Sequence, residues 1–336
     1  MSTRGTEGRH FGVVRELKNQ YAEAQSLGIP KELLERLQAR VKELMPPLMA
    51  WRERFPAILA SRLKPATLGS VAGHPEVTFE QQLLIAKAGL LVFAVDDIAD
   101  GEIGALEDAQ VQRVLERYVE TVRAPDSQEW TGADEASFVG GAVQDVARQL
   151  HAAPGAGRFL ALWQEHFRRM CSGHLTELRD KRRSQQDGAL PTLEHYLDVS
   201  RWTCGAPMYH CAALVVLAPD FTGEPLQEPL VEQALSDMGL LGRWMNDVRS
   251  LERERAEGKF NSLTLLCAAG RSEAEAEREA VERAGQHLES LSDVAGRLPE
   301  PLRPWGKSLV ATGHFSRMFY MQREFHHPEA SSSEEV

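Results

Sequence analysis

A long apolar run in this chain ends in three carboxylates. Apolar side chains continue almost without interruption from Leu83 to Val95, and Asp96, Asp97 and Asp100 follow directly. In a helix, these aspartates share one rim of the last turn, where the negative end of the helix dipole disfavours anions by about 0.3–1 kcal/mol each. A divalent cation would offset this penalty and their mutual repulsion. The pattern therefore predicts a metal site, with a solvated acidic helix end as the alternative.

A second set of oxygen-bearing side chains occurs later in the chain, in "RWMNDVRSLERERAEGKFNS". Asn246, Ser250 and Glu254 have i, i+4, i+8 spacing, so one helix face presents an amide oxygen, a hydroxyl and a carboxylate. Such hard donors suit Mg²⁺, and the adjacent Arg253 is able to grip phosphate oxygens. The alternative is an exposed helix with i, i+4 ion pairs, which does not account for the amide and hydroxyl in this register.

The elements that position these residues are predicted to be helices throughout. Apolar residues recur at helical spacing, as in Leu37, Val41 and Leu44, and no stretch alternates as a strand would. Gly- and Pro-rich breakers separate the helices, and Gly101 is predicted to end the helix after the aspartates. We expect an all-α fold: a single-domain helical bundle with a central active-site cavity over residues 1–325, followed by a disordered tail at 326–336.

Composition excludes several classes of protein. The 336 residues carry a net charge of −11, which argues against a nucleic-acid partner. The apolar run ending at Val95 is too short to span a bilayer, and the N-terminus lacks the apolar core of a signal peptide, so we expect no membrane insertion. The four cysteines lack CxxC spacing and are predicted to be reduced thiols, as in a cytoplasmic protein.

The two polar motifs together resemble a known family. "DDIAD" at 96–100 is similar to the aspartate-rich motif of class I terpene synthases, and "NDVRSLERE" from Asn246 is similar to their second metal motif. Their order and separation resemble the microbial single-domain members over about residues 60–325. The resemblance implies the class I terpenoid synthase fold and three Mg²⁺ ions, with Mn²⁺ as a possible substitute, held by Asp96, Asp97, Asp100, Asn246, Ser250 and Glu254. Asp96 is the strongest candidate ligand, whereas Asp97 could instead pair with an arginine.

The family also has an arginine that senses diphosphate, followed by a linker and an effector residue. Arg201 precedes Asn246 by 45 residues, and Cys204 and Gly205 stand three and four places after it. Gly205 and Pro207 predict a helix break that frees backbone carbonyls. The resemblance thus implies catalytic roles for Asp96, Arg201 and Gly205.

The C-terminal region departs from the family pattern. Members usually carry an adjacent Arg-Tyr pair, whereas here Arg317 and Tyr320 lie one helical turn apart and Arg323 is an alternative. The resemblance implies that diphosphate is bound by Arg201, Arg253, Arg317 and Tyr320.

The implied activity is Mg²⁺-dependent ionisation of a prenyl diphosphate, followed by cyclisation or elimination in an apolar cavity that excludes water. Small residues in "AKAGLLVFA", "GAPMYHCAALVV" and "LLGRW" predict a roomy cavity and favour slightly a C20 substrate, geranylgeranyl or labdane-type diphosphate, over C15 farnesyl diphosphate.

The alternatives are a chain-elongating prenyl diphosphate synthase and a catalytically silent helical scaffold. The family resemblance is compatible with a homodimer. Candidate aromatic wall residues are Phe93, Trp202, Tyr209, Trp244, Phe315 and Phe319.

Overall fold

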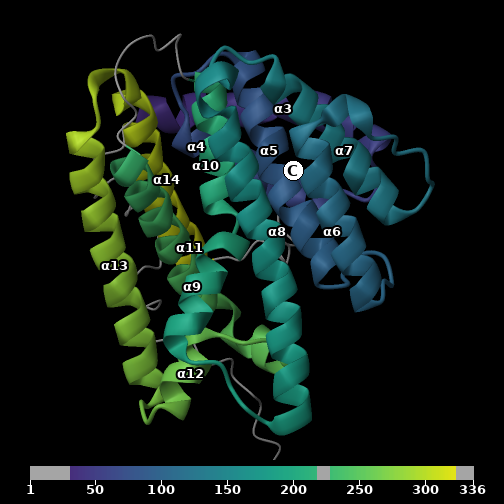
Figure 1. Cartoon of the computed structure of the whole chain (residues 1–336). Helices are drawn as coiled ribbons and strands as arrows, with labels where there is room; N and C mark the ends of the chain where they lie inside the picture. Colours follow the sequence, from purple (N-terminus) through teal and green to yellow (C-terminus); the bar gives the residue numbers. More distant parts are fainter. Residues whose placement is uncertain (1–30, 218–227, 323–336) are drawn as a thin grey trace, which may run out of the picture.

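The computed structural model describes residues 31–217 and 228–322, and every regular element in these two ranges is helical (Figure 1). The all-α prediction is confirmed for this part of the chain. Arg323 and the tail at 326–336 lie outside the described residues. In chain order the elements are α3 (Lys31–Arg54), α4 (Ala60–Gly73), α5 (Phe79–Ala99), α6 (Asp108–Arg123), η1 (Pro125–Ser127), α7 (Glu135–His151), α8 (Ala156–Asp187), α9 (Leu193–Thr203), α10 (Ala206–Leu217), α11 (Glu228–Glu257), α12 (Ser262–Ala268), α13 (Glu273–Arg297), η2 (Glu300–Leu302) and α14 (Arg303–Gln322).

Helix α5 carries the acidic motif and lies inside the bundle. It begins after a capping box, in which Thr78 accepts a hydrogen bond from the Gln81 N–H and the Gln81 side chain accepts one from the Thr78 N–H. Most of its side chains are buried, on all sides of the helix, which is the expected location for a helix that is apolar all round. It ends at Ala99, and Gly101 follows with φ +74°, so the predicted stop is confirmed.

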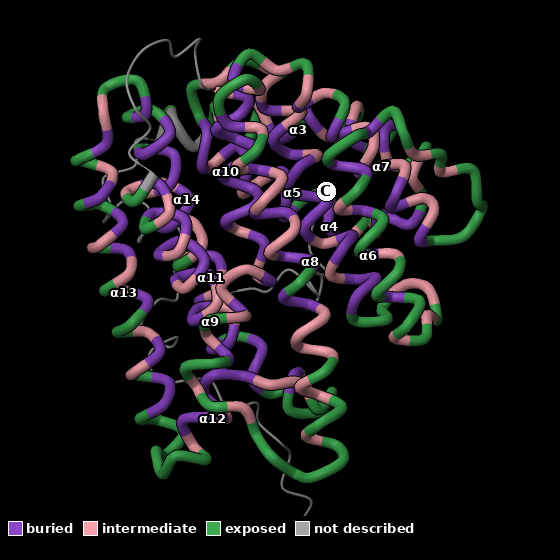
Figure 2. Tube along the Cα trace, viewed as in Figure 1, coloured by how far each residue is buried: buried purple, intermediate pink, exposed green. Residues whose placement is uncertain are grey.

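Two groups of helices surround this interior. Helices α3, α4, α6 and α7 pack around α5, whereas α11, α13 and α14 pack against one another (Figure 1). Helices α8 and α10 contact each other; α8 also contacts α6 and α9, and α10 also contacts α5 and α11. The buried residues lie on the faces that these helices turn toward one another (Figure 2). This arrangement places the C-terminal ends of α5 and α11 on the same side of the bundle.

The predicted break within the "SRWTCGAP" segment is present between α9 and α10, at Cys204 and Gly205. Gly205 adopts φ +71°, a left-handed conformation that favours glycine. A Cβ atom at this position would lie 2.0 Å from Cγ1 of Val92 in α5. Gly205 is therefore required both by its backbone conformation and by the close approach of the chain to α5.

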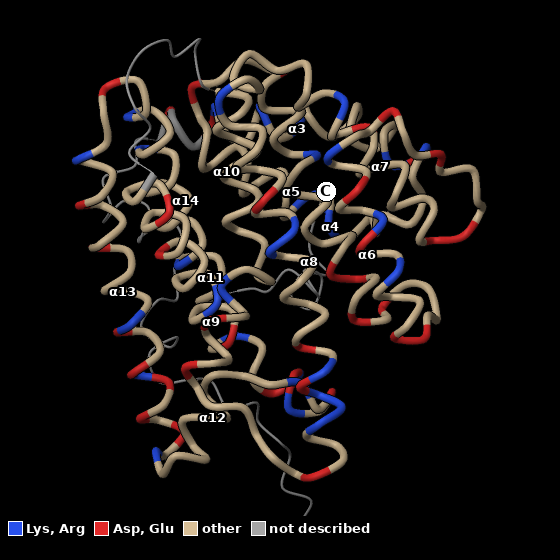
Figure 3. The backbone as a smooth tube through the Cα atoms, in the orientation of Figure 1, with Lys and Arg blue, Asp and Glu red and all other residues tan. Residues whose placement is uncertain are grey.

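Lys and Arg positions gather on the C-terminal part of α8 (Figure 3). None of the described helices is sufficiently long and apolar to cross a membrane. All four cysteines are free thiols, as predicted.

Candidate active site

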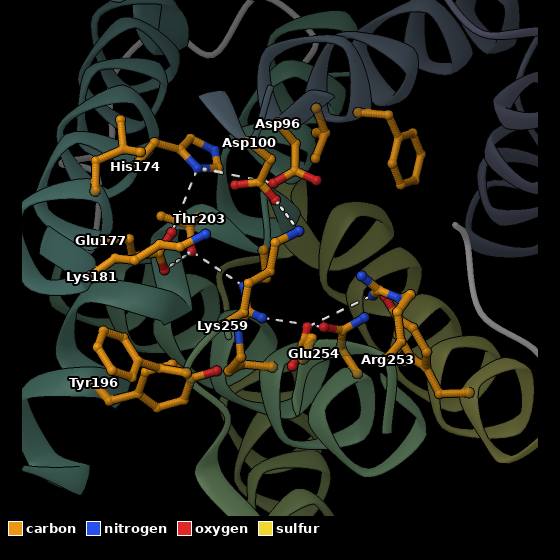
Figure 4. A pocket seen from close by; sticks show the side chains of 18 of the residues that line it. Asp96, Asp100, His174, Glu177, Lys181, Tyr196, Thr203, Arg253, Glu254 and Lys259 are labelled. Carbon is orange, nitrogen blue, oxygen red and sulfur yellow. Dashed lines mark hydrogen bonds and ion pairs between the residues drawn. The ribbon is translucent and has the colours of Figure 1, made fainter. Parts of the chain in front are cut away.

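A cavity of about 160 Å³ lies where the C-terminal end of α5 meets the C-terminal half of α11 (Figure 4). Helices α4, α8, α9 and α14 complete its wall. Most of the residues that line it are polar or charged, with acidic and basic side chains facing one another. The lining residues are Arg62, Val92, Phe93, Asp96, Asp100, His174, Glu177, Leu178, Lys181, Tyr196, Thr203, Cys204, Arg243, Asn246, Arg253, Glu254, Lys259, Phe260 and Tyr320.

The aspartate motif is divided between the cavity and the core. Asp96 and Asp100 line the cavity, whereas Asp97 is 1% exposed and is not among the lining residues. The Oδ1 atom of Asp97 lies 2.5 Å from Nη2 of Arg62, which is also buried. The assignment of Asp97 as a metal ligand is therefore not supported, and its alternative, pairing with an arginine, is what the structure shows. Consecutive residues point about 100° apart around a helix, so Asp96 and Asp97 face different surroundings.

Asp96 lies in an environment that disfavours its negative charge. Burial is the main cause, followed by the charge of Asp100, and together they raise the pKa of Asp96 to about 7. His174 on α8 opposes this shift, with its Nδ1 atom 4.0 Å from Asp96 Oδ1. A divalent cation beside Asp96 would stabilise the ionised carboxylate.

The second motif also reaches the cavity, through Asn246 and Glu254. Burial, followed by the charge of Asp247, raises the pKa of Glu254 to about 7. Ser250 is buried between them and donates a hydrogen bond to the carbonyl oxygen of Asn246 over 2.8 Å. Ser250 is not among the lining residues, but its hydroxyl oxygen keeps lone pairs for a cation while its proton is donated to that carbonyl.

The oxygen donors of the cavity fit a magnesium ion that is shared with a substrate. Across residues 31–217 and 228–322, no group of three His, Cys, Asp or Glu side chains is arranged to hold a metal ion by itself. Mg²⁺ is usually bound through one or two carboxylates, with water and phosphate oxygens completing its shell. Asp96, Asp100, Asn246 and Glu254 supply such partial sets on two sides of one cavity.

Arg201 is not among the residues that line the cavity. Its guanidinium forms an ion pair with the exposed Asp198, and its Nη1 atom donates to Ser236 Oγ over 3.1 Å. The predicted contact between Arg201 and a diphosphate therefore has no support in this geometry. Gly205 does not line the cavity either, but it packs against Val92, which does.

The other residues predicted to bind diphosphate differ in whether they line the cavity. Arg253 and Tyr320 line the cavity, whereas Arg317 on the same helix as Tyr320 is exposed. Arg253 is 15% exposed and lies 3.0 Å from Glu257 and 3.8 Å from Glu254. The displaced Arg-Tyr pair is thus represented at the cavity by its tyrosine alone among the described residues.

Arg243 is a cavity residue that sequence reasoning did not assign. Its Nη1 atom lies 3.2 Å from Asn246 Oδ1 and 3.4 Å from Asp247 Oδ1, and its Nη2 atom donates to Thr203 over 3.2 Å. Its position three residues before Asn246, on the same helix face, is the signal that could have identified it. The cavity residues of α8, which are His174, Glu177, Leu178 and Lys181, carried no comparable signal.

The predicted roomy interior is not observed in the described structure, because larger neighbours fill the space beside the small residues. Tyr209 packs against Gly89, Val92 against Gly205 and Cys204 against Gly242. The cavity is smaller than the roughly 300–1,000 Å³ typical of ligand pockets. Of the candidate aromatic wall residues, Phe93 lines it.

The fold is that of the class I terpenoid synthases. A linalool/nerolidol synthase from Streptomyces clavuligerus in complex with 2-fluorogeranyl diphosphate superposes with a TM-score of 0.63 at 17% identity, over 85% of this chain and 92% of that one. Isoprene synthase from grey poplar (Populus x canescens), in complex with three Mg²⁺ ions and dimethylallyl-S-thiolodiphosphate, gives a TM-score of 0.64 at 17% identity, over 86% of this chain and 55% of that one.

Sequence comparison identifies the family. Residues 87–291 match Terpene synthase family 2, C-terminal metal binding, and the chain belongs to this family. A class I diterpene synthase of Vitex agnus-castus is 29% identical over 230 residues, which are 65% of this chain and 36% of that protein. The chain spans about a third of the length of the curated relatives that it matches.

Proposed function

We propose that this chain is a Mg²⁺-dependent class I terpene synthase that ionises a prenyl diphosphate and releases diphosphate and a terpene. The observation that carries the proposal is the convergence of Asp96 and Asp100 with Asn246 and Glu254 on one cavity that also contains arginines. Family membership gives independent support. A solvated acidic helix end does not account for carboxylates that share a cavity with the second motif.

The proposed metal site consists of Asp96 and Asp100 on one wall and Asn246, Glu254 and the adjacent Ser250 on the other. Bound Mg²⁺ supplies a Lewis acid that stabilises the charge of the departing diphosphate. Three ions are proposed for this chain, as in the isoprene synthase complex. The raised pKa values of Asp96 and Glu254 agree with the fit, because burial and a neighbouring carboxylate leave each negative charge poorly stabilised without a cation.

Cationic side chains of this chain would complete the binding of the diphosphate. Arg243 and Arg253 lie on the same helix as the second motif and line the cavity. A planar guanidinium is able to donate two hydrogen bonds to phosphate oxygens, which orients the leaving group. In this proposal Arg243 takes the role that the sequence spacing predicted for Arg201.

The carbocation formed from the prenyl tail requires a wall without water or nucleophiles. Val92, Phe93 and Leu178 provide apolar and aromatic surface beside the acidic end of α5. A bound tail needs more space than the present cavity offers, so side chains in this region must move when it binds.

We propose a C20 substrate, geranylgeranyl or labdane-type diphosphate, in preference to C15 farnesyl diphosphate. Support comes from the similarity to a class I diterpene synthase and not from cavity volume. The chain-elongating alternative predicts longer prenyl diphosphates as products, and the scaffold alternative predicts no turnover.

The test is incubation of the purified chain with Mg²⁺ and equal amounts of geranyl, farnesyl, geranylgeranyl and labdane-type diphosphates in one reaction. Gas chromatography with mass spectrometry then reports hydrocarbon products, and phosphatase treatment of a parallel sample reports elongated diphosphates. We expect C20 terpenes to dominate. Preferential C15 products would overturn the proposed chain length, and elongated diphosphates would overturn the reaction class.

A further inference from the structure

Lys259 is held at the cavity by the way in which α11 ends. Gly258 follows the helix with φ +65° and donates its N–H to the carbonyl of Arg255. The N–H of Lys259 donates to the carbonyl oxygen of Glu254 over 2.8 Å, which completes the two hydrogen bonds of a Schellman motif. The backbone of Lys259 is therefore tied to the last residue of the second motif.

The side chain of Lys259 extends from this turn to the first motif (Figure 4). Its Nζ atom lies 2.7 Å from Asp100 Oδ2, 3.0 Å from Glu257 Oε2 and 3.9 Å from Glu102 Oε1. The Lys259 side chain is 21% exposed and lines the cavity. Burial alone would lower the pKa of Lys259, but the charge of Asp100 and the hydrogen bonds with Asp100 and Glu257 outweigh it and raise the pKa.

A lysine ammonium and a divalent cation compete for the same carboxylate oxygens. Both require the lone pairs of Asp100, and two cations at neighbouring positions repel each other strongly where water is partly excluded. Direct binding of Mg²⁺ to Asp100 therefore weakens the contact with Lys259. Because the backbone of Lys259 is hydrogen-bonded to Glu254 and its side chain contacts Asp100, this exchange connects the second motif to the first.

Resting on the proposed function, we propose that Lys259 is an exchangeable internal cation of the metal site. It neutralises Asp100 before metal binds and is released into the cavity when a divalent ion takes its place. This gives the second motif a direct influence on metal binding at the first motif, through one side chain. Lys259 thereby sets how tightly the enzyme binds metal before substrate arrives.

The first test measures metal binding without any prenyl substrate. Mn²⁺ is used as the probe, because electron paramagnetic resonance reports its free fraction, and the full chain is first treated with a chelator. Lys259→Met should bind Mn²⁺ on the order of tenfold more tightly than the wild type. The matched control is Lys181→Met, which removes another cationic side chain from the same cavity.

Equal tightening in the two variants would mean that only total charge matters, and would overturn the proposal. Binding to Lys259→Met that is unchanged, weaker or undetectable would also overturn it. Adding Asp100→Asn to Lys259→Met should abolish the gain, because the contested carboxylate is then gone.

The second test uses the unaltered protein, so it does not depend on the folding of a variant. An acetylating N-hydroxysuccinimide ester is applied with and without Mg²⁺, and peptide mass spectrometry quantifies modification of Lys259. We expect Mg²⁺ to increase modification of Lys259 several-fold relative to Lys181; equal modification with and without Mg²⁺ would contradict the exchange. Neither test requires turnover. If the chain makes no terpene but still shows the exchange of Lys259 for a divalent ion, the proposed function is wrong and the exchange is supported.

Discussion

Arg62 and Asp97 form a buried ion pair at the end of α5, with 2.5 Å between Nη2 and Oδ1 and at most 2% exposure of either side chain. Asp96, the preceding residue, lines the cavity instead. The two adjacent aspartates of one motif therefore have separate tasks. Asp97 joins α5 to α4, and Asp96 is available to a cation.

This division predicts opposite effects for two identical substitutions. Asp97→Asn removes the carboxylate that neutralises the buried Arg62 charge, which we expect to cost about 3–5 kcal/mol of unfolding free energy. Urea denaturation followed by circular dichroism measures this loss. An Asp97→Asn protein as stable as the wild type would show that the buried pair contributes little.

Asp96→Asn is predicted to remain folded and to lose activity. Asparagine keeps the size of the side chain and removes a charge that burial and Asp100 already disfavour, so stability should fall little, if at all. Turnover should decrease on the order of 10²-fold or more, because the cation that stabilises the leaving group is bound less well. Steady-state diphosphate release at several Mg²⁺ concentrations is the measurement. Near-normal turnover at saturating Mg²⁺ would count against Asp96 as a ligand.

Arg243 and Arg201 offer a direct contrast between geometry and sequence spacing. Lysine keeps the charge at either position but lacks the planar fork of arginine. Since Arg243 lines the cavity and Arg201 bonds to Asp198 and Ser236, Arg243→Lys should lower kcat/KM strongly and Arg201→Lys only slightly. Measuring kcat/KM and the melting temperature of both variants shows which arginine contributes to catalysis. A larger loss in Arg201→Lys would restore the sensor assignment made from spacing.

Gly205 and Gly258 provide a matched pair for the helix break. Both have positive φ, but a Cβ at Gly205 would clash with Val92, whereas nothing lies within 4 Å of one at Gly258. Gly258→Ala should cost about 1–3 kcal/mol through backbone strain alone, and Gly205→Ala distinctly more. Thermal unfolding of both proteins gives the comparison. Equal destabilisation of Gly205→Ala and Gly258→Ala would mean that α5 shifts to accommodate the added methyl group at no energetic cost.

The sequence allowed the fold class and most residues of the proposed metal site to be identified, because both depend on regular helical spacing. The apolar run before Asp96 identifies α5 as an interior helix, and the i, i+4, i+8 spacing from Asn246 places the second motif on one helix face. The helix break at Gly205 was predictable because glycine and proline act locally.

The remaining features depend on contacts between helices, which local patterns do not encode. The partner of Asp97 is 35 residues away on α4, and Lys259 reaches Asp100 across 159 residues. Arg201 has the expected spacing, but the orientation of α9 directs it to Ser236 on α11. Similarly, Gly89 predicted open space, whereas packing of α10 brings Tyr209 against it.

The most direct test of the proposed activity is release of diphosphate from geranylgeranyl diphosphate by the purified chain, measured with and without Mg²⁺. We predict release that requires Mg²⁺, is accompanied by a C20 hydrocarbon or alcohol, and is lost in both Asp96→Asn and Glu254→Gln but retained in Asp108→Asn, an acidic residue outside the cavity. Release that continues after chelation, or that survives in both cavity variants, would contradict a reaction at the site formed by α5 and α11. So would a chain that releases no diphosphate from any prenyl substrate.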